Sequence, residues 1–574
     1  MPGTVPFETV DQLAARVADG ASLAIGGTLF TRMPVALIAA VCARAPRGLH
    51  YLSWGGGFPL EMLLEAGSVD TATMCFSSLD VFGQAPRFRA AVESGSLTLT
   101  ELSAHAFHQG LSAGRRRLAS EPMIWPAASD LTTLPGFPAA VTDPVSGELV
   151  GAAPAIRPDA LLLHAQAADS AGNIELFGAR GIDLTVIPAA RSVLVTVEEV
   201  VDRSQLGLRR NSLVLPKHLV TAVAVVPGGA YPTSCLPYYV SDYTALHEWS
   251  AADSPIVDVP VAQWLPGPVD DVTVDSVLAG LPAPRAAAEV TPDEWMTVWL
   301  ARQYDNESIC SVGAVSPLAT SSYLLAKATH APELTLITNG GGYVDVLPRP
   351  LLFGLGEWLD ARSSTMHSGG EESYELFYQP GLVTHEVVSV AQIDSHGRTN
   401  NRMVTSPSGR LVRLPGQGGM ADVADMHRDF FIYLPRQSVL NTPDSVSFVT
   451  AARALIRDED RLAAGYQPGR VRLVTNLAVF GLDVDSDRFV IEAVFPWTTI
   501  EELAESTGWA LGIDPLAGIP VVDEPTETEL TALRTTVDPL GLRRLEFVAS
   551  KEREPLLTEV LAADRALLRA VIRG

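Results

Sequence analysis

The hydrophobic pattern near the start of the chain predicts alternating strands and helices. A short apolar run at residues 22–25 is typical of a buried strand and leads into a glycine pair at 26–27. A helix is expected over residues 35–43 and a second strand over 49–53, which ends at a glycine triplet, 55–57. Short apolar runs bounded by glycine and proline favour strands that are covered on both faces.

The second half of the chain repeats this order of elements. A strand is expected over residues 308–312, a helix over 317–328 and a strand over 334–337, followed by a glycine triplet at 340–342. Either copy alone could be an ordinary strand–turn–helix, so the repeated order is the informative observation.

A second echo lies further along each half. The segment Asp169-Ser170-Ala171-Gly172 resembles Asp394-Ser395-His396-Gly397. The two echoes align Gly55 with Gly340, and Asp169 with Asp394. Because strands alternate with helices, we predict an α/β fold of two tandem, duplicated α/β domains with mainly parallel sheets.

A boundary between the halves is visible in the composition. Residues 266–290 are rich in proline, alanine and acidic side chains, which is typical of a linker. It divides the chain into a first domain at 1–265 and a second at 291–574. Thr291, with Pro292 and two acidic residues behind it, has the form of a helix start.

Composition and charge limit the kinds of molecule that the protein is expected to bind. The 574 residues are 47% hydrophobic and 19% charged, and 41 Lys and Arg against 66 Asp and Glu give a formal charge of -25. Such an acidic chain is a poor general binder of nucleic acid or of an anionic membrane. The apolar runs are far shorter than the roughly 20 residues that span a bilayer. Four scattered cysteines and an N-terminus without a signal-peptide pattern indicate a reduced, cytoplasmic protein.

Glycine-rich turns are the strongest candidates for ligand contacts. Glycine between a strand and a helix lets backbone N–H groups approach a phosphate, a carboxylate or a developing oxyanion. The triplet at 55–57 is not a dinucleotide-binding GxGxxG, because Leu60 stands at the last position. A longer turn covers residues 415–420. Taken singly, each turn could be structural only.

Several other chemistries are not supported. GxxxxGK[ST], GxSxG and HExxH do not occur in the sequence. His105 and His108 lie close together, but two histidines do not make a metal site, and we expect them to be surface or structural residues. We predict no metal.

Taken together, the ordered pattern resembles the family I coenzyme A transferases, with their two subunits fused. The order of motifs in the second half is most similar to glutaconate-type transferase β subunits, and the match spans nearly the whole chain. Five segments carry it: Gly26-Gly27 with Pro34; Gly228-Gly229-Ala230-Tyr231-Pro232-Thr233-Ser234-Cys235, similar to the family's G-A-H-P-S-S-C turn; Ala391-Gln392-Ile393-Asp394-Ser395-His396-Gly397; Gly416-Gln417-Gly418-Gly419; and Phe495-Pro496-Trp497-Thr498-Thr499-Ile500 with Ser506-Thr507-Gly508-Trp509.

The resemblance implies an acyl-CoA ligand at the junction of the halves, with coenzyme A as part of the substrate and no other cofactor. It also implies a homo-oligomer, a dimer. The glycines expected to bind CoA or an oxyanion are Gly26, Gly27, Gly55, Gly56, Gly340, Gly341, Gly416, Gly418 and Gly419.

The family's catalytic glutamate has no match here. The resemblance places it after the strand that ends at the second glycine triplet, where this chain has Thr338 and Asn339. A carboxylate that attacks the thioester forms a mixed anhydride, which reacts readily with the released CoA thiolate. A threonine hydroxyl would form an ester that reacts with the thiolate only slowly, and asparagine is not a nucleophile.

A branch of the family that hydrolyses carbon–carbon bonds in steroid-derived CoA thioesters also lacks that glutamate. It is similar in having a T-D-G-type turn at this place and a glutamate in its first subunit that matters for activity. The segment around Glu101 resembles the surroundings of that residue, so Glu101 is the candidate base. The alternative is that Glu101 forms a structural ion pair.

Three functions remain open at this point. The first is a CoA-thioester-dependent hydrolase in which water attacks a carbonyl of the substrate. The second is a CoA transferase whose carboxylate lies elsewhere, and the third is a non-catalytic acyl-CoA-binding protein.

Overall fold

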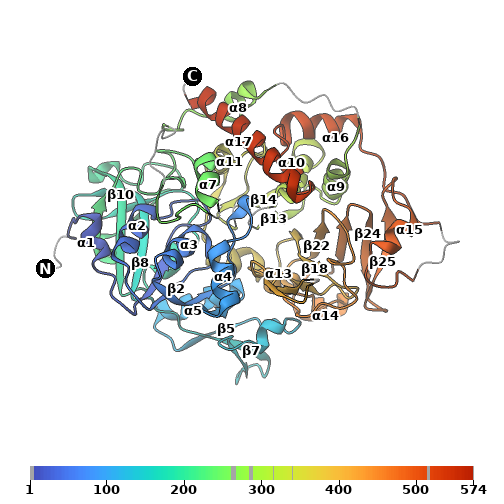
Figure 1. Cartoon of the computed structure of the whole chain (residues 1–574), viewed down its shortest axis with the longest axis horizontal. Helices are drawn as coiled ribbons and strands as arrows, with labels where there is room; N and C mark the ends of the chain where they lie inside the picture. The colour runs from blue at the N-terminus through green and yellow to red at the C-terminus, as the bar shows by residue number, and fades with distance from the viewer. Residues whose placement is uncertain are drawn as a thin grey trace.

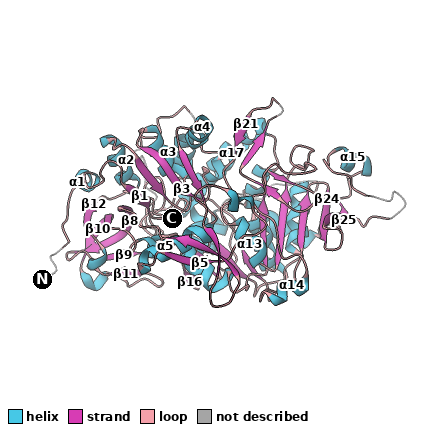
Figure 2. Ribbon diagram, turned by 90° about the horizontal axis from the view of Figure 1, so that it is seen from below, coloured by secondary structure: helices cyan, strands magenta, loops and turns pink. Residues whose placement is uncertain are grey.

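A computed structural model describes residues 5–251, 253–259, 267–282, 289–313, 316–338, 340–406, 408–512 and 518–572. Figure 1 shows the first half of the chain, in blue to green, beside the second half, in yellow to red. Figure 2 shows the strands gathered in two groups with helices around them. No described helix has both the length and the apolar character needed to cross a membrane.

The first sheet has nine described strands, and most neighbouring strands are parallel. Only the pairings of β9 with β8 and with β11 are antiparallel. The strands are β1 Ser22–Ile25, β2 Leu49–Leu52, β3 Val69–Met74, β4 Thr98–Glu101, β8 Ala160–Asp169, β9 Ile174–Leu176, β10 Ser192–Val201, β11 Leu213–Leu215 and β12 Ala222–Val225. The main helices are α2 Val35–Arg44, α3 Gly57–Glu65, α4 Pro86–Ser94, α5 Ala104–Arg116 and α7 Tyr243–Ser250.

The second sheet also has nine described strands, parallel in the centre and antiparallel at both edges. They are β13 Ile309–Ser311, β14 Thr335–Thr338, β15 Tyr343–Val344, β16 Met366–His367, β17 His385–Ser389, β22 Asp429–Leu434, β23 Val471–Thr475, β24 Ala478–Asp483 and β25 Arg488–Val494. The main helices are α9 Pro292–Ala301, α10 Pro317–Thr329, α11 Gly354–Ser363, α13 Met420–Met426 and α17 Ser550–Ile572.

Strand register shows that the two halves are copies of one design. Gly55 lies four residues beyond the β2 residue that pairs with Leu23, and Gly340 lies four residues beyond the β14 residue that pairs with Cys310. Since β1 and β13 are the equivalent first strands of the repeat, Gly55 and Gly340 occupy the same place. This was predicted from the sequence.

The second predicted pair is equivalent down to its hydrogen bonds. Asp169 and Asp394 each accept, through Oδ1, the backbone N–H groups two and four residues further on. In both turns the Asp carbonyl also accepts the N–H of the glycine three residues later. The aspartate therefore builds the same turn twice, and the glycine allows its positive φ at Gly172 and Gly397.

The predicted boundary region is partly helical. β12 ends and β13 begins on either side of it, and residues 267–282 include α8 Val274–Gly280, which packs on α17. Val269, Val272 and Val277 are buried, so this stretch belongs to a core. Residues 266 and 283–288 lie outside the described part, and the exact domain limits stay a prediction. The predicted helix start is confirmed, because Thr291 caps α9 in a capping box with Glu294.

Candidate active site

A cavity of about 430 Å³ lies where the two halves meet. Its walls come from the glycine-rich turns of both halves and from aromatic side chains such as Trp54, Phe76 and Tyr374. Of the nine glycines proposed from the sequence, eight line it: Gly26, Gly27, Gly55, Gly56, Gly340, Gly416, Gly418 and Gly419. Gly341 turns away, and its carbonyl accepts hydrogen bonds from two serine hydroxyls, of which that of Ser373 is 2.9 Å away.

Most of these glycines donate their N–H groups to acceptors within the protein. Gly27 donates to Asp183 at 2.8 Å, and Asp183 is held in turn by the fully buried Arg32. The N–H groups of Gly26, Gly56, Gly416 and Gly418 donate to backbone carbonyls. These residues shape the cavity without an N–H to offer a ligand.

Of the eight predicted glycines that line the cavity, three have an N–H group without an acceptor among the described residues: Gly55, Gly340 and Gly419. Gly55 and Gly340 are the equivalent residues of the two halves. A Cβ on Gly340 would come within 3.4 Å of the ring of Trp54, and both glycines line the cavity. The cavity therefore holds donors from both halves.

A second, smaller cavity of about 160 Å³ borders the first. Both are lined by Leu29, Phe30, Asp80, Gly313 and Ser316. The smaller cavity contains the end of β14, where a catalytic carboxylate was expected by resemblance and where the sequence has threonine.

Thr338 lines this smaller cavity and is held by a buried ion pair. Its hydroxyl donates to Asp360 Oδ2 at 2.9 Å, and Arg349 binds both oxygens of the same carboxylate at 2.6 Å each. Both oxygens of Asp360 are bound by Arg349, so this ion pair anchors the Thr338 hydroxyl. Asn339 lies outside the described residues.

Glu101 forms an ion pair with two arginines. Arg413 donates to its two carboxylate oxygens at 2.6 and 2.9 Å, and Arg402 donates at 2.7 Å. Burial alone would raise the pKa of Glu101, but the arginines outweigh burial and lower it. The described residues that line the two cavities do not include Glu101. This geometry favours the structural alternative for Glu101 over the role of base.

Two site features were not found from the sequence. Asp80 lines both cavities and has a backbone φ of 59°. His108, expected to be surface or structural, is 3% exposed and lines the larger cavity. Burial lowers the pKa of His108 to about 4, so its imidazole is neutral. His105 is equally buried, so the surface alternative is wrong for both.

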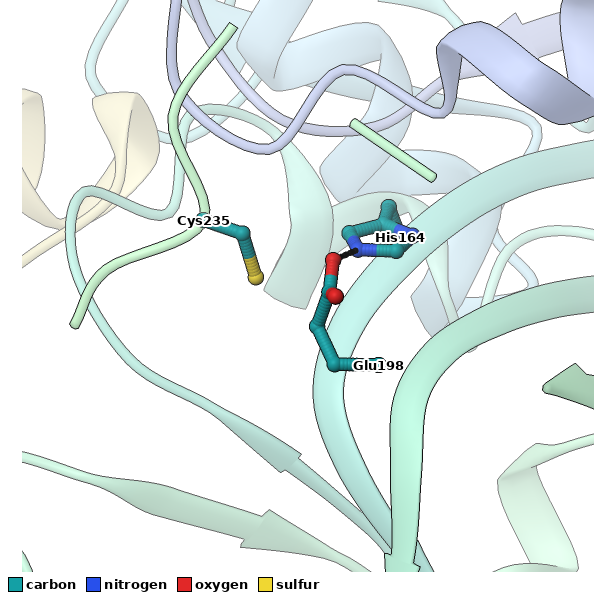
Figure 3. A group of neighbouring side chains, drawn as sticks. All are labelled: His164, Glu198 and Cys235. Atoms are coloured by element: carbon teal, nitrogen blue, oxygen red, sulfur yellow. Dashed lines mark hydrogen bonds and ion pairs between the residues drawn. The ribbon is translucent and has the colours of Figure 1, made fainter. Parts of the chain in front are cut away.

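Figure 3 shows a group that could be mistaken for a metal site, in which the side chains of His164, Glu198 and Cys235 face one another. Their possible ligand atoms all lie within 4.8 Å of one another. However, Glu198 already accepts hydrogen bonds from His164, Tyr239 and the Gly228 N–H. These hydrogen bonds fasten the loop after β12 to β8 and β10.

Comparisons with known proteins agree with this architecture. The family model described as Coenzyme A transferase matches residues 7–225. Both subunits of the 3-oxoadipate CoA-transferase of Pseudomonas knackmussii are similar to this chain. One is 30% identical over 246 residues, which covers 42% of this chain and 91% of that one. The other is 32% identical over 238 residues, which covers 41% of this chain and 83% of that one.

A hydrolase subunit is also similar. The cholesterol ring-cleaving hydrolase IpdA subunit of Mycobacterium tuberculosis is 29% identical over 262 residues, which covers 43% of this chain and 87% of that one. Among solved structures, an acyl-CoA transferase of Escherichia coli O157:H7 covers 91% of this chain and 96% of its own, with a TM-score of 0.65. At 15% identity that structure supports the fold alone.

Proposed function

Because the chain belongs to the coenzyme A transferase family, we propose that it processes acyl-CoA esters, and that it does so as a CoA-thioester-dependent hydrolase. The observation that carries the hydrolase proposal is the side chain at the end of β14. Thr338 stands there with its hydroxyl hydrogen-bonded to Asp360, and the next residue in the sequence is Asn339. Neither supplies a carboxylate.

Without a carboxylate at this place, the usual exchange of CoA between acids loses its intermediate. Transfer requires an acyl anhydride that the released CoA thiolate can attack. A threonine ester is more stable than an anhydride and would react slowly with the thiolate. A threonine hydroxyl that is held by an aspartate already paired with an arginine is also a poor nucleophile. Water as the attacking group needs no covalent intermediate.

The free glycine N–H groups support stabilisation of an oxyanion. Donors fixed about 3 Å from the place where negative charge develops lower the barrier for attack on a carbonyl. Gly55, Gly340 and Gly419 have such N–H groups at the cavity wall. Gly341, the ninth glycine proposed from the sequence, has no place in this arrangement.

Two reactions fit the cavity. Attack of water on the thioester carbonyl releases the CoA thiol. Attack on a carbonyl further along the acyl chain breaks a carbon–carbon bond and leaves CoA on one product. The similarity to a protein named as part of a ring-cleaving hydrolase favours the second.

Transfer remains the second candidate, because similarity to the two 3-oxoadipate CoA-transferase chains is of the same order. Its nucleophile would be another cavity carboxyl, such as Asp80 or Glu386. The third candidate is a non-catalytic acyl-CoA-binding protein. We also propose that the chain acts in the cytoplasm as a homodimer.

The need for an acceptor acid separates these functions. Purified protein is incubated with a panel of acyl-CoA and 3-oxoacyl-CoA esters, with and without acetate and succinate, and all products are followed by mass spectrometry. We expect at least one ester to be consumed at the same rate with and without acceptor. Consumption only with an acceptor would establish transfer, and binding without consumption of any ester would establish a non-catalytic protein.

A further inference from the structure

Asp80 is the one residue with a carboxyl group that lines both described cavities. We infer that Asp80 is the group that transfers protons during the reaction, taking a proton from water supplied by the smaller cavity while the acyl-CoA carbonyl lies in the larger one. This inference rests on the proposed hydrolase function and assigns its acid–base residue.

The backbone around Asp80 fixes where the carboxyl lies. Asp80 follows β3 and begins a short 3-10 turn, Asp80–Phe82, that is closed by hydrogen bonds from Leu79 to Gly83 at 2.8 Å and from Gly83 to Asp80 at 2.9 Å. Its φ of 59° is in the left-handed region, which is unfavourable for most residues other than Gly, Asn and Asp. Aspartate is one of the few side chains that tolerate this region, and the turn fixes the position of the residue.

Charge distinguishes Asp80 from the buried carboxylates near the cavities. Asp183 is paired with Arg32 and Asp360 with Arg349. Asp80 forms no ion pair with a described residue, and its one strong contact is the N–H of Val81 at 2.6 Å. A carboxylate without a cation keeps its basicity.

The groups that surround Asp80 do not cancel this basicity. Tyr243 of α7 and Glu357 of α11 are neutral or anionic. Arg349 is paired with Asp360, and Arg553 of α17 donates to the Val81 carbonyl and forms no ion pair with Asp80. Burial raises the pKa of Asp80 to about 7, so the carboxyl can both accept and return a proton near neutral pH.

The smaller cavity is suited to hold water. Its polar walls include the side chains of Thr31, Ser316, Thr320, Arg349 and Glu357. A water molecule takes up roughly 30 Å³ in the liquid and needs two to four polar partners, so a cavity of about 160 Å³ has room for a few. Asp80 therefore lines both a cavity with room for water and the proposed ester-binding cavity.

The proton transfers balance without any further reactant. The Asp80 carboxylate takes a proton from water as the water oxygen forms a bond to the carbonyl carbon, and the carbonyl electron pair moves to its oxygen. When this oxyanion collapses, the bond to the leaving group breaks. The leaving group is the CoA sulfur or, in a 3-oxoacyl ester, the carbon next to the thioester. Its electron pair takes the proton back from Asp80.

Glu357 is a weaker candidate for the same role. Its two oxygens accept hydrogen bonds from the hydroxyls of Thr31, Tyr343 and Ser234. These donors hold the carboxylate in place and occupy its acceptor positions, so it has less capacity to take a proton from water.

The test compares Asp80→Asn with Asp70→Asn, a control that removes an exposed carboxyl from β3. Asparagine has the size of aspartate and tolerates the left-handed region, so both variants should fold, which melting curves verify. We expect Asp80→Asn to lower the rate of acceptor-free hydrolysis by roughly a hundredfold or more. The pH dependence of the wild-type rate near pH 7 should disappear with it, and Asp70→Asn should match wild type.

A second measurement needs no substrate. Infrared difference spectra between wild type and Asp80→Asn should contain a carboxyl band that titrates near pH 7.

The outcomes separate this inference from the proposed function. If acceptor-free hydrolysis occurs and Asp80→Asn retains the wild-type rate and pH profile, the inference is wrong and the function stands. If wild type needs an acceptor acid, the function fails and the inference fails with it. A missing infrared band would also overturn the inference.

Discussion

Asp80 and Glu101 are two carboxyl groups beside neighbouring parallel strands that have opposite surroundings. Glu101 ends β4, opposite the last residue of β3, and Asp80 lies in the loop that follows β3. In open α/β sheets this carboxyl edge is where ligands bind. Glu101 is bound by two arginines from the second half, whereas Asp80 forms no ion pair with a described residue. The position of a carboxyl group in the sheet therefore does not identify it as catalytic. The presence or absence of charged neighbours does.

The largest effect expected from this difference is on stability. Glu101→Gln leaves Arg413, whose side chain is 2% exposed, without a counter-charge. Removing one partner of a buried pair typically costs about 3–5 kcal/mol. We expect a large drop in the free energy of unfolding, measured by urea denaturation. Asp485→Asn, which removes a distant exposed pair with Arg457, should change little.

An unchanged stability for Glu101→Gln, together with a loss of turnover, would restore Glu101 as the base and break the comparison. A stable variant with full turnover would show that the ion pair is dispensable.

At Asp80 we expect a smaller effect on the free energy of unfolding, with the opposite dependence on pH. The pKa of Asp80 is raised above that of an unfolded aspartate, so the folded protein binds the proton more tightly between about pH 4 and pH 7. Its contribution to stability is therefore present at low pH and is lost as pH rises through about 7. For Glu101 the pKa is lowered, so stability is lost as pH falls.

Asp80→Asn should therefore melt a few degrees higher than wild type at pH 8, since about 1 kcal/mol moves the midpoint by about 2–4 °C in domains of 150–250 residues. Calorimetry at pH 4 should show this gain vanish. A lower midpoint at pH 8 would mean that the charged carboxylate stabilises the fold, contrary to the account.

Local backbone patterns were readable in the sequence. The helix start at Thr291 and the repeated turns at Asp169 and Asp394 depend on side chains that bond to their own neighbours within four residues. Glycine is favoured where φ is positive, as at Gly57, Gly340 and Gly341 of the two triplets, so these turns were recognisable in the sequence.

The roles of the carboxyls were not readable in this way. Glu101 meets Arg402 and Arg413 across sequence separations of 301 and 312 residues, so only the tertiary fold shows that it is neutralised. The left-handed φ of Asp80 belongs to a short local turn, and His108 is buried, but no short sequence motif marks either feature.

The central claim is that no carboxylate of this enzyme is acylated during turnover. The direct measurement is to incubate the protein with a consumed acyl-CoA ester without acceptor, add borohydride, and map any reduced glutamate or aspartate by mass spectrometry. Thr338→Val serves as the control for an ester on that hydroxyl. The account predicts turnover with no reduced side chain and no dependence on Thr338. A reduced residue, above all at Asp80 or Glu386 in the cavity, would contradict it and establish a transferase.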